Sequence, residues 1–202
     1  MSLIEAVGVI FGLFSVWFAV REDNWTWPTG IVNCVLFGIL FWGNRWYVNV
    51  GLQVLYIVYN LYSWYMWLYG GKGRTALVIG RTPARAWWIL WPVVGAATLV
   101  VGRIFTLYTD DTVPYWDAVT VALSLVAQYV MTRKWLEHWW VWVIANAIYL
   151  GLGIYNHNYA FAGLQIVNIV LSAMGYLAWR KDWLAAGAVQ SQAQPAASPE
   201  PL

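Results

Sequence analysis

The residues best suited to chemistry in this chain are carboxamides and aromatic rings that recur every three or four positions within apolar stretches. Three such series occupy residues 49–67, 142–153 and 165–179. Their members are Asn49, Gln53, Tyr56, Asn60, Ser63 and Trp67; Trp142, Asn146, Tyr149 and Gly153; and Gln165, Asn168, Ser172, Gly175 and Trp179. This spacing places each series on one face of a helix. We therefore expect three helix faces that combine amides with aromatic rings.

Amide side chains both donate and accept hydrogen bonds, so these faces suit a ligand that carries hydroxyl or carboxamide groups. An amide left unpaired in hydrocarbon costs several kcal/mol, so amides in apolar stretches must face one another or water. A single amide of this kind is more often a link between helices, contributing about 0.6 kcal/mol. Three corresponding faces favour a shared polar cavity. The predicted polar contacts are Asn33, Gln53, Tyr56, Asn60, Asn146, Gln165 and Asn168.

Aromatic rings beside these amides predict flat walls for the ligand. Trp27, Trp64, Trp142 and Tyr149 lie in register with the polar faces. A pyridinium-like cation between such rings would gain about 0.5–2 kcal/mol from cation–π contact. The alternative role of each tryptophan is anchoring at the membrane surface, where Trp and Tyr collect.

The elements that must position these residues are membrane helices. The chain is 61% hydrophobic and only 10% charged, which excludes an ordinary soluble domain and predicts an all-α integral membrane protein. Seven stretches are long enough to cross a bilayer. They are roughly residues 3–20, 27–42, 46–69, 87–107, 115–132, 139–155 and 159–179.

An internal repeat organises these seven helices. Residues 51–67 (GLQVLYIVYNLYSWYMW) return 112 positions later as residues 163–179 (GLQIVNIVLSAMGYLAW). In the second helix of each half the spacing becomes 113, which pairs Trp27 with Trp140 and predicts a one-residue slip. Three crossings reverse the side of the chain, so parallel copies need a linker helix between them. This predicts a 3+1+3 parallel-repeat arrangement.

The predicted segments follow from this arrangement. A first three-helix repeat occupies residues 1–69, and a basic cytoplasmic loop with the linker helix occupies 70–114. The second repeat occupies residues 115–183, and the Ala-, Gln- and Pro-rich residues 184–202 form a disordered tail.

The basic residues predict the orientation. With the N-terminus outside and the C-terminus cytoplasmic, nine of the eleven Lys and Arg residues fall on the cytoplasmic side. Charges within the spans, such as Glu5 and Asp117, lie near the outer ends. Both His138 and His157 lie at span ends and are expected to be solvated. Because no mid-span ionisable residue is available to carry a proton or organise a sodium site, we expect passive transport.

Short motifs resemble the PnuC family of vitamin transporters over residues 3–183. They are Trp27-Pro28-x-Gly30, Gln53-x-x-Tyr56-x-x-x-Asn60-x-x-x-Trp64-x-x-Trp67, and Trp139-Trp140-x-Trp142-x-x-x-Asn146. The resemblance is strongest to nicotinamide riboside transporters. It implies a SWEET-like fold, a homotrimer in the bacterial inner membrane, and facilitated diffusion of nicotinamide riboside followed by intracellular phosphorylation. It implies no nucleic acid partner.

Two other kinds of function remain open from the residues alone. A membrane-embedded enzyme acting on a lipid or nucleotide would need a nucleophile, a base or a metal cluster, and none is evident, so no catalytic residue, metal or cofactor is predicted. A structural membrane subunit would leave the amides unexplained. Physical chemistry does not rank nicotinamide riboside against thiamine or riboflavin, since all carry rings and hydroxyls. The resemblance makes that choice.

Overall fold

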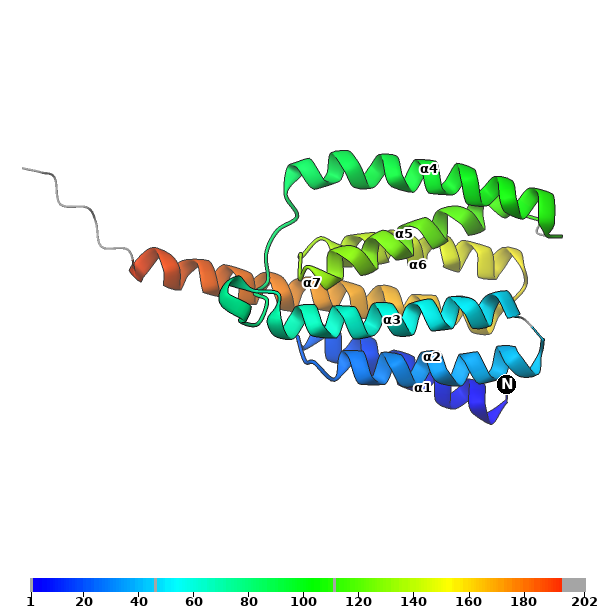
Figure 1. Cartoon of the computed structure of the whole chain (residues 1–202), viewed down its shortest axis with the longest axis horizontal. Coiled ribbons are helices and arrows are strands. Elements are labelled where there is room, and N and C mark those ends of the chain that lie inside the picture. The colour runs from blue at the N-terminus through cyan, green and yellow to red at the C-terminus, as the bar shows by residue number, and fades with distance from the viewer. Residues whose placement is uncertain (1, 46, 111, 194–202) are drawn as a thin grey trace, which may run out of the picture.

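The computed structural model describes residues 2–45, 47–110 and 112–193, which form an all-helical bundle (Figure 1). Its helices run lengthwise beside one another, as the sequence predicts. They are α1 (Leu3–Val20), α2 (Thr26–Gly43), α3 (Tyr47–Tyr69), α4 (Ala84–Tyr108), α5 (Pro114–Thr132), α6 (His138–Tyr155) and α7 (Tyr159–Ala193), with a short 3₁₀ helix, η1 (Lys72–Arg74).

Four of the described helices are long and apolar enough to cross a membrane. They are α1, α2, α4 and the part of α7 that ends at residue 188. The sequence predicts crossings by α3, α5 and α6 as well, which have 23, 19 and 18 residues. Their amides, tryptophans and tyrosines lower their apolarity, and the same residues form the polar faces within the bundle.

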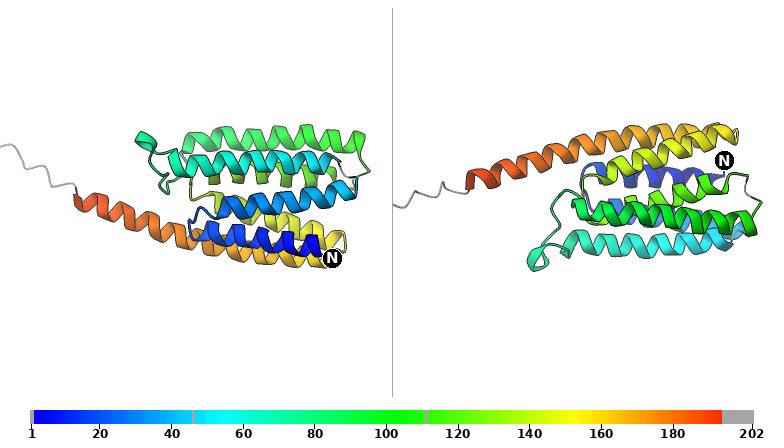
Figure 2. Two further views of the ribbon diagram at one scale, coloured as in Figure 1. Left: turned by 60° about the horizontal axis from the view of Figure 1, so that its bottom comes forward. Right: turned by 90° about the horizontal axis from the view of Figure 1, so that it is seen from above.

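The helices pack in two sets of three. α2 lies between α1 and α3, and α6 lies between α5 and α7 (Figures 1 and 2). The two sets meet where α1 packs on α7 and where α3 packs on α5. α4 packs chiefly on α5, at the edge of the bundle.

The turns of the two sets have a constant spacing of 112 residues. Glu22 and Lys134 have positive φ angles of 58° and 50°, and Arg45 and His157 have 62° and 55°. The helices after the first pair of turns begin at Thr26 and His138. The predicted one-residue slip is therefore wrong, because the turns of both sets have the same length.

The corrected spacing makes Trp139, and not Trp140, the counterpart of Trp27. Trp27 and Trp139 are 1% and 2% exposed, whereas Trp140 is 51% exposed. Because Trp139 and Trp140 are adjacent, the sequence allows either to be aligned with Trp27. Only Trp139 is buried as Trp27 is.

A cluster of four tryptophans, Trp27, Trp67, Trp139 and Trp179, joins the two sets at the end of the bundle opposite the N-terminus. We call this end the tryptophan end. The Trp67 indole donates to the Met131 carbonyl at 3.0 Å, and the Trp179 indole donates to the Ala19 carbonyl at 2.9 Å. Trp27 packs edge-on against Trp67, and Trp139 edge-on against Trp179. The absence of a side chain at Gly175 leaves room for the Trp139 ring.

His138 belongs to this cluster and not to the solvent. The expectation that it is solvated is wrong, because its ring is 0% exposed and packs against Trp139 and Trp179. Its Nδ1 lies 2.8 Å from the Trp135 carbonyl. His157 is exposed, as expected.

The segment between α3 and α4, residues 70–83, crosses the tryptophan end, and we call it the strap. Its Leu77 N–H donates to the Trp67 carbonyl at 3.0 Å. Further along, Gly80 exchanges backbone hydrogen bonds with the turn between α5 and α6, donating to Lys134 at 3.0 Å and accepting from Leu136 at 2.9 Å. The strap therefore contacts both three-helix sets.

The C-terminal segment differs from the predicted tail. α7 continues to Ala193, so residues 184–193 are helical where disorder was predicted. They project beyond the other helices (Figure 1). This segment is rich in Ala, a strong helix former, and it extends a helix already nucleated in the bundle. The rest of the predicted tail, residues 194–202, lies outside the described residues.

We expect the contact between the strap and Glu137 to depend on pH. The Glu137 carboxylate accepts from Arg81 Nε at 2.8 Å and from the Thr82 N–H and hydroxyl at 2.7 and 2.8 Å. Burial alone would raise the pKa of Glu137, but these hydrogen bonds together hold the pKa below its ordinary 4.5. The resulting stability is complete above pH 4.5 and is lost as the pH falls through the lowered pKa.

Thermal unfolding of Glu137→Gln in detergent, measured from pH 7 down to pH 3, tests this dependence. The variant should be less stable at pH 7, and the difference from the wild type should shrink in acid. A difference that stays constant with pH would contradict the assignment.

Candidate functional site

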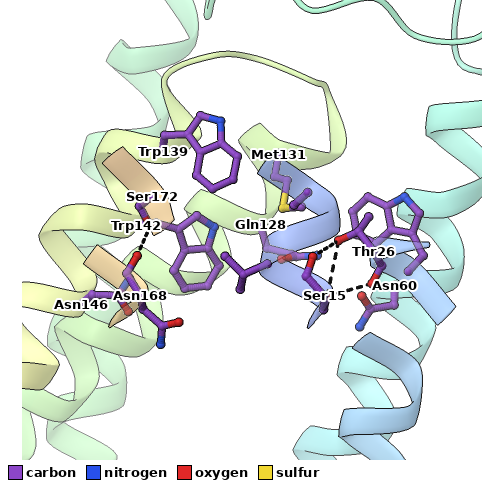
Figure 3. Close-up of a pocket in the computed structure, with 13 residues that line it drawn as sticks. Ser15, Thr26, Asn60, Gln128, Met131, Trp139, Trp142, Asn146, Asn168 and Ser172 are labelled. Carbon is purple, nitrogen blue, oxygen red and sulfur yellow. Dashed lines mark hydrogen bonds between the residues drawn. The ribbon is translucent and has the colours of Figure 1, made fainter. Parts of the chain in front are cut away.

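A cavity of about 160 Å³ lies between the two three-helix sets, next to the tryptophan cluster (Figure 3). Six helices contribute to its lining, and α4 does not. The thirteen lining residues are Ser15, Val16, Ala19, Thr26, Trp27, Asn60, Gln128, Met131, Trp139, Trp142, Asn146, Asn168 and Ser172. None of them carries a formal charge. The cavity therefore offers amides, hydroxyls and indole rings in a neutral setting.

Five of the residues predicted from sequence line this cavity. They are Trp27, Asn60, Trp142, Asn146 and Asn168. They come from α2, α3, α6 and α7, so the fold brings together amides and rings that are far apart in the chain. Asn60 and Asn146 lie well inside their helices, away from either end.

Three other predicted residues make contacts away from the cavity. Asn33 Nδ2 donates to the Gly8 carbonyl at 2.8 Å and so joins α2 to α1. Gln53 lines a separate groove along α2 and α3 that also contains Cys34 and Gly38. Trp64 packs against the tryptophan cluster.

The last three predicted residues also lie outside the cavity lining. Tyr149 packs edge-on against Phe161, with ring centroids 5.9 Å apart. The Tyr56 carbonyl accepts a hydrogen bond from Asn60 Nδ2 at 2.8 Å. Gln165 is buried in α7. A role in substrate binding stays a prediction for all eleven residues.

The lining also contains residues that the sequence analysis did not assign to the site. Gln128 carried a usable signal, because it is an amide within an apolar stretch, and Ser172 belongs to a predicted polar face. Trp139 was visible only as a family motif. Ser15 and Thr26 resemble ordinary packing residues, and Val16, Ala19 and Met131 carry no chemical signal at all.

The tryptophan end closes one side of the cavity. Ala19, Trp27, Met131 and Trp139 belong both to the cavity lining and to the buried core of that end. The indole N–H groups of Trp27 and Trp139 are buried and have no hydrogen-bond partner among the described residues.

An ion pair covers this closure. Lys134 Nζ lies 2.7 Å from Glu22 Oε1 and 4.5 Å from the centroid of the Trp67 ring. Glu22 and Lys134 occupy the turns of the two different sets, so the pair links them. The Lys134 side chain is only 7% exposed; Glu22 balances its charge, and the face of the Trp67 ring adds a cation–π contact.

Comparison with known sequences identifies the family. A sequence family described as "Nicotinamide mononucleotide transporter" matches residues 2–181. The chain belongs to this family. The nicotinamide riboside transporter PnuC of Escherichia coli (strain K12) is 30% identical over 89% of this chain and 85% of its own length. The riboflavin/roseoflavin transporter RibM of Streptomyces davaonensis is 29% identical over 89% of this chain and 84% of its own.

A solved structure shares the fold. The crystal structure of the vitamin B3 transporter PnuC superposes with a TM-score of 0.69 at 20% identity, covering 88% of this chain and 80% of that one. The relatives are named as transporters, so the family member described here is a multi-pass membrane transporter and not an enzyme. The resemblance seen in the short motifs is confirmed.

Removing one of the indole-to-carbonyl hydrogen bonds should destabilise the transporter. Trp179→Phe takes away the indole donor to Ala19 and should lower the free energy of unfolding by about 0.5–1.5 kcal/mol, because the carbonyl loses this hydrogen bond but keeps the Glu22 N–H. Trp88→Phe on α4 is the control, since Trp88 is 83% exposed. Melting temperatures in detergent check this. Equal values for the two variants would count against a structural role for the bond.

Proposed function

We propose that this transporter carries nicotinamide riboside across the membrane by facilitated diffusion through the cavity. The observation that carries the proposal is a buried, uncharged cavity that combines amides with indole rings. The substrate has a carboxamide and ribose hydroxyls, which amides can bind, and a cationic ring suited to an indole face. The name of the Escherichia coli relative supports the same substrate.

The lining favours the riboside over the mononucleotide that the family description names. Transfer of a phosphate group from water into a buried site is strongly unfavourable unless a cation balances its charge. No Lys or Arg lines the cavity, and Lys134 at the tryptophan end is already paired with Glu22. The added phosphate should therefore abolish most of the affinity.

Riboflavin is the second candidate. The Streptomyces relative is named as a riboflavin transporter and is almost as similar to this chain as the Escherichia coli relative. The flat ring and the ribityl hydroxyls of riboflavin could be bound by the same indole faces and amides. Competition by riboflavin, thiamine and nicotinamide mononucleotide against labelled nicotinamide riboside, with purified protein, ranks these substrates directly.

We further propose that α1–α3 and α5–α7 are two copies of one unit, joined by α4 in a SWEET-like 3+1+3 arrangement. The constant spacing of the turns supports this. The two indole hydrogen bonds also match, because the donors Trp67 and Trp179 are 112 residues apart and so are the acceptors Ala19 and Met131. Residues 1–69 and 115–183 are then the repeats. Rocking of one unit against the other would expose the cavity to each side in turn.

The proposed orientation puts the tryptophan end in the cytoplasm of a bacterial cell. Arg21, Arg133, Lys134 and the basic residues of the strap all lie at this end, which the positive-inside rule assigns to the cytoplasm. The N-terminus is then outside, and the described state is closed toward the cytoplasm. Assembly as a homotrimer follows from the family resemblance.

The aromatic wall can be tested with neighbouring tryptophans of α6. Trp142→Leu should weaken nicotinamide riboside binding by about 1–2 kcal/mol if the ring stacks on the substrate. Trp140→Leu is the matched control, because Trp140 lies outside the cavity and packs on Tyr176. Calorimetric titration of both proteins checks the difference. If both bind like the wild type, Trp142 does not form a substrate wall.

Transport should be passive, because no ionisable side chain lines the cavity. In sealed vesicles without gradients, free nicotinamide riboside should equilibrate and never concentrate. A pH or sodium gradient at zero membrane potential should leave the steady-state level unchanged. A membrane potential would act on the cationic substrate itself and is therefore clamped. Accumulation under a proton or sodium gradient would contradict passive transport and would direct attention to Glu5 and Asp117.

A further inference from the structure

We propose that the two walls of the cavity have different tasks. Gln128, with Asn146 and Asn168, recognises the hydrogen-bonding groups of the substrate, while the wall from α1–α3 is a preformed support. This inference rests on the proposed function, because it assigns the recognition of that substrate to particular residues. It adds Gln128, which the sequence analysis did not assign to the site.

In the α1–α3 wall, the hydroxyls of Ser15 and Thr26 and the amide N–H of Asn60 already have protein partners, whereas the Trp27 indole N–H has none among the described residues. The Ser15 hydroxyl donates to the Thr26 carbonyl at 2.8 Å, and the Thr26 hydroxyl donates to the Ser15 carbonyl at 2.7 Å. The Asn60 Nδ2 donates to the Tyr56 carbonyl at 2.8 Å. A Cβ at Gly30 would lie 3.0 Å from the Asn60 Oδ1 and 3.1 Å from the Ser15 Oγ, so Gly30 packs closely beneath both. This wall is fixed by its own contacts.

The amides of the opposite wall have no such partners. Within the described residues, no hydrogen bond involves the side-chain amide of Gln128, Asn146 or Asn168, although all three line the cavity. The Thr132 hydroxyl uses only the backbone carbonyl of Gln128, at 2.8 Å. The Ser172 hydroxyl likewise donates to the backbone carbonyl of Asn168, at 2.7 Å. The three amides are therefore available to a ligand.

The positions of these amides suit a ligand held between the walls. Figure 3 shows Asn146, Asn168 and Trp142 on one side, Ser15, Thr26 and Asn60 on the other, and Gln128 between them. A ring placed on Trp142 would carry its substituents past Gln128. Asn146 is buried and Gln128 and Asn168 are half-buried, so their amides are open to the cavity, where a ligand or water would complete their hydrogen bonds.

All three amides belong to α5–α7. In the proposed rocking motion they move together, so the substrate would keep its hydrogen bonds while the α1–α3 wall moves relative to it. The contacts of the three amides would then set the substrate specificity whichever side of the membrane the cavity opens to. The α1–α3 wall would control whether substrate can enter or leave the cavity.

Gln128→Met tests the proposal, because methionine keeps the length of the side chain and removes the amide. Its affinity for nicotinamide riboside should fall roughly tenfold or more, as for the loss of one buried hydrogen bond. Asn49→Leu is the control, since it removes an amide from α3 outside the cavity. Its affinity should stay within about twofold of the wild type. Melting temperatures show that each protein is folded.

Truncated ligands separate direct contact from a structural effect. If Gln128 binds a substrate group, the loss caused by Gln128→Met should disappear for one of two ligands: the pyridinium riboside without a carboxamide, or free nicotinamide without ribose. Should the methionine variant fail to fold, Gln128→Asn keeps the amide on a shorter chain and should give an intermediate loss.

The outcomes distinguish this inference from the function it rests on. Unchanged affinity in Gln128→Met, or an equal loss for all three ligands, would overturn the recognition role while leaving the transporter's substrate intact. A wild-type protein that does not bind nicotinamide riboside would overturn the proposed function and this assignment together.

Discussion

The arrangement of this transporter depends on two hydrogen bonds from indole rings to helix-end carbonyls. Ala19 and Met131 lie in the last turns of α1 and α5, where their carbonyls accept the backbone N–H groups of Glu22 at 3.0 Å and Lys134 at 2.9 Å. Trp179 and Trp67 reach across from the other three-helix set and give each carbonyl a second donor. Each set thus binds a helix end of the other. These two bonds hold the helices around the cavity together at the tryptophan end.

The residues that close the bundle also line the cavity, so substrate binding in the proposed site would be coupled to the conformation of the bundle. Trp27 and Trp139 line the cavity and pack against the two donor indoles. A substrate that touches them would contact the closed state differently from an opened one. A ligand can shift a conformational equilibrium only through such differences. The site needs no charge for this purpose, because its position next to the closure is sufficient.

Apolar length and three-or-four spacing predicted the helices and the residues Asn60, Trp142, Asn146 and Asn168 correctly as members of inward faces. The same signal at Asn33 and Gln53 did not lead to the cavity, since periodicity gives the face of a helix but not its neighbour. Asn33 instead donates a hydrogen bond to the Gly8 carbonyl. Ala19 and Met131 act through their backbones, which no residue pattern reveals. The sequence alone could not align Trp139 rather than Trp140 with Trp27, because the lengths of the turns decide it. It also could not show that residues 184–193 are helical, because they continue a helix that forms in the bundle.

The strap gives the two sets unequal freedom. It leaves α3 at Tyr69, bonds to Trp67 through Leu77, and then bonds to Lys134, Leu136 and Glu137 of the opposite set before α4 begins. A short tether fixed at both ends limits how far its attachment points can separate. The α3–α5 side of the tryptophan end is therefore tied by the backbone of the strap, whereas the α1–α7 side is held by side-chain contacts, among them the Trp179–Ala19 hydrogen bond. Separation of α1 from α7 would break these side-chain contacts while the strap still limited the distance between α3 and α5.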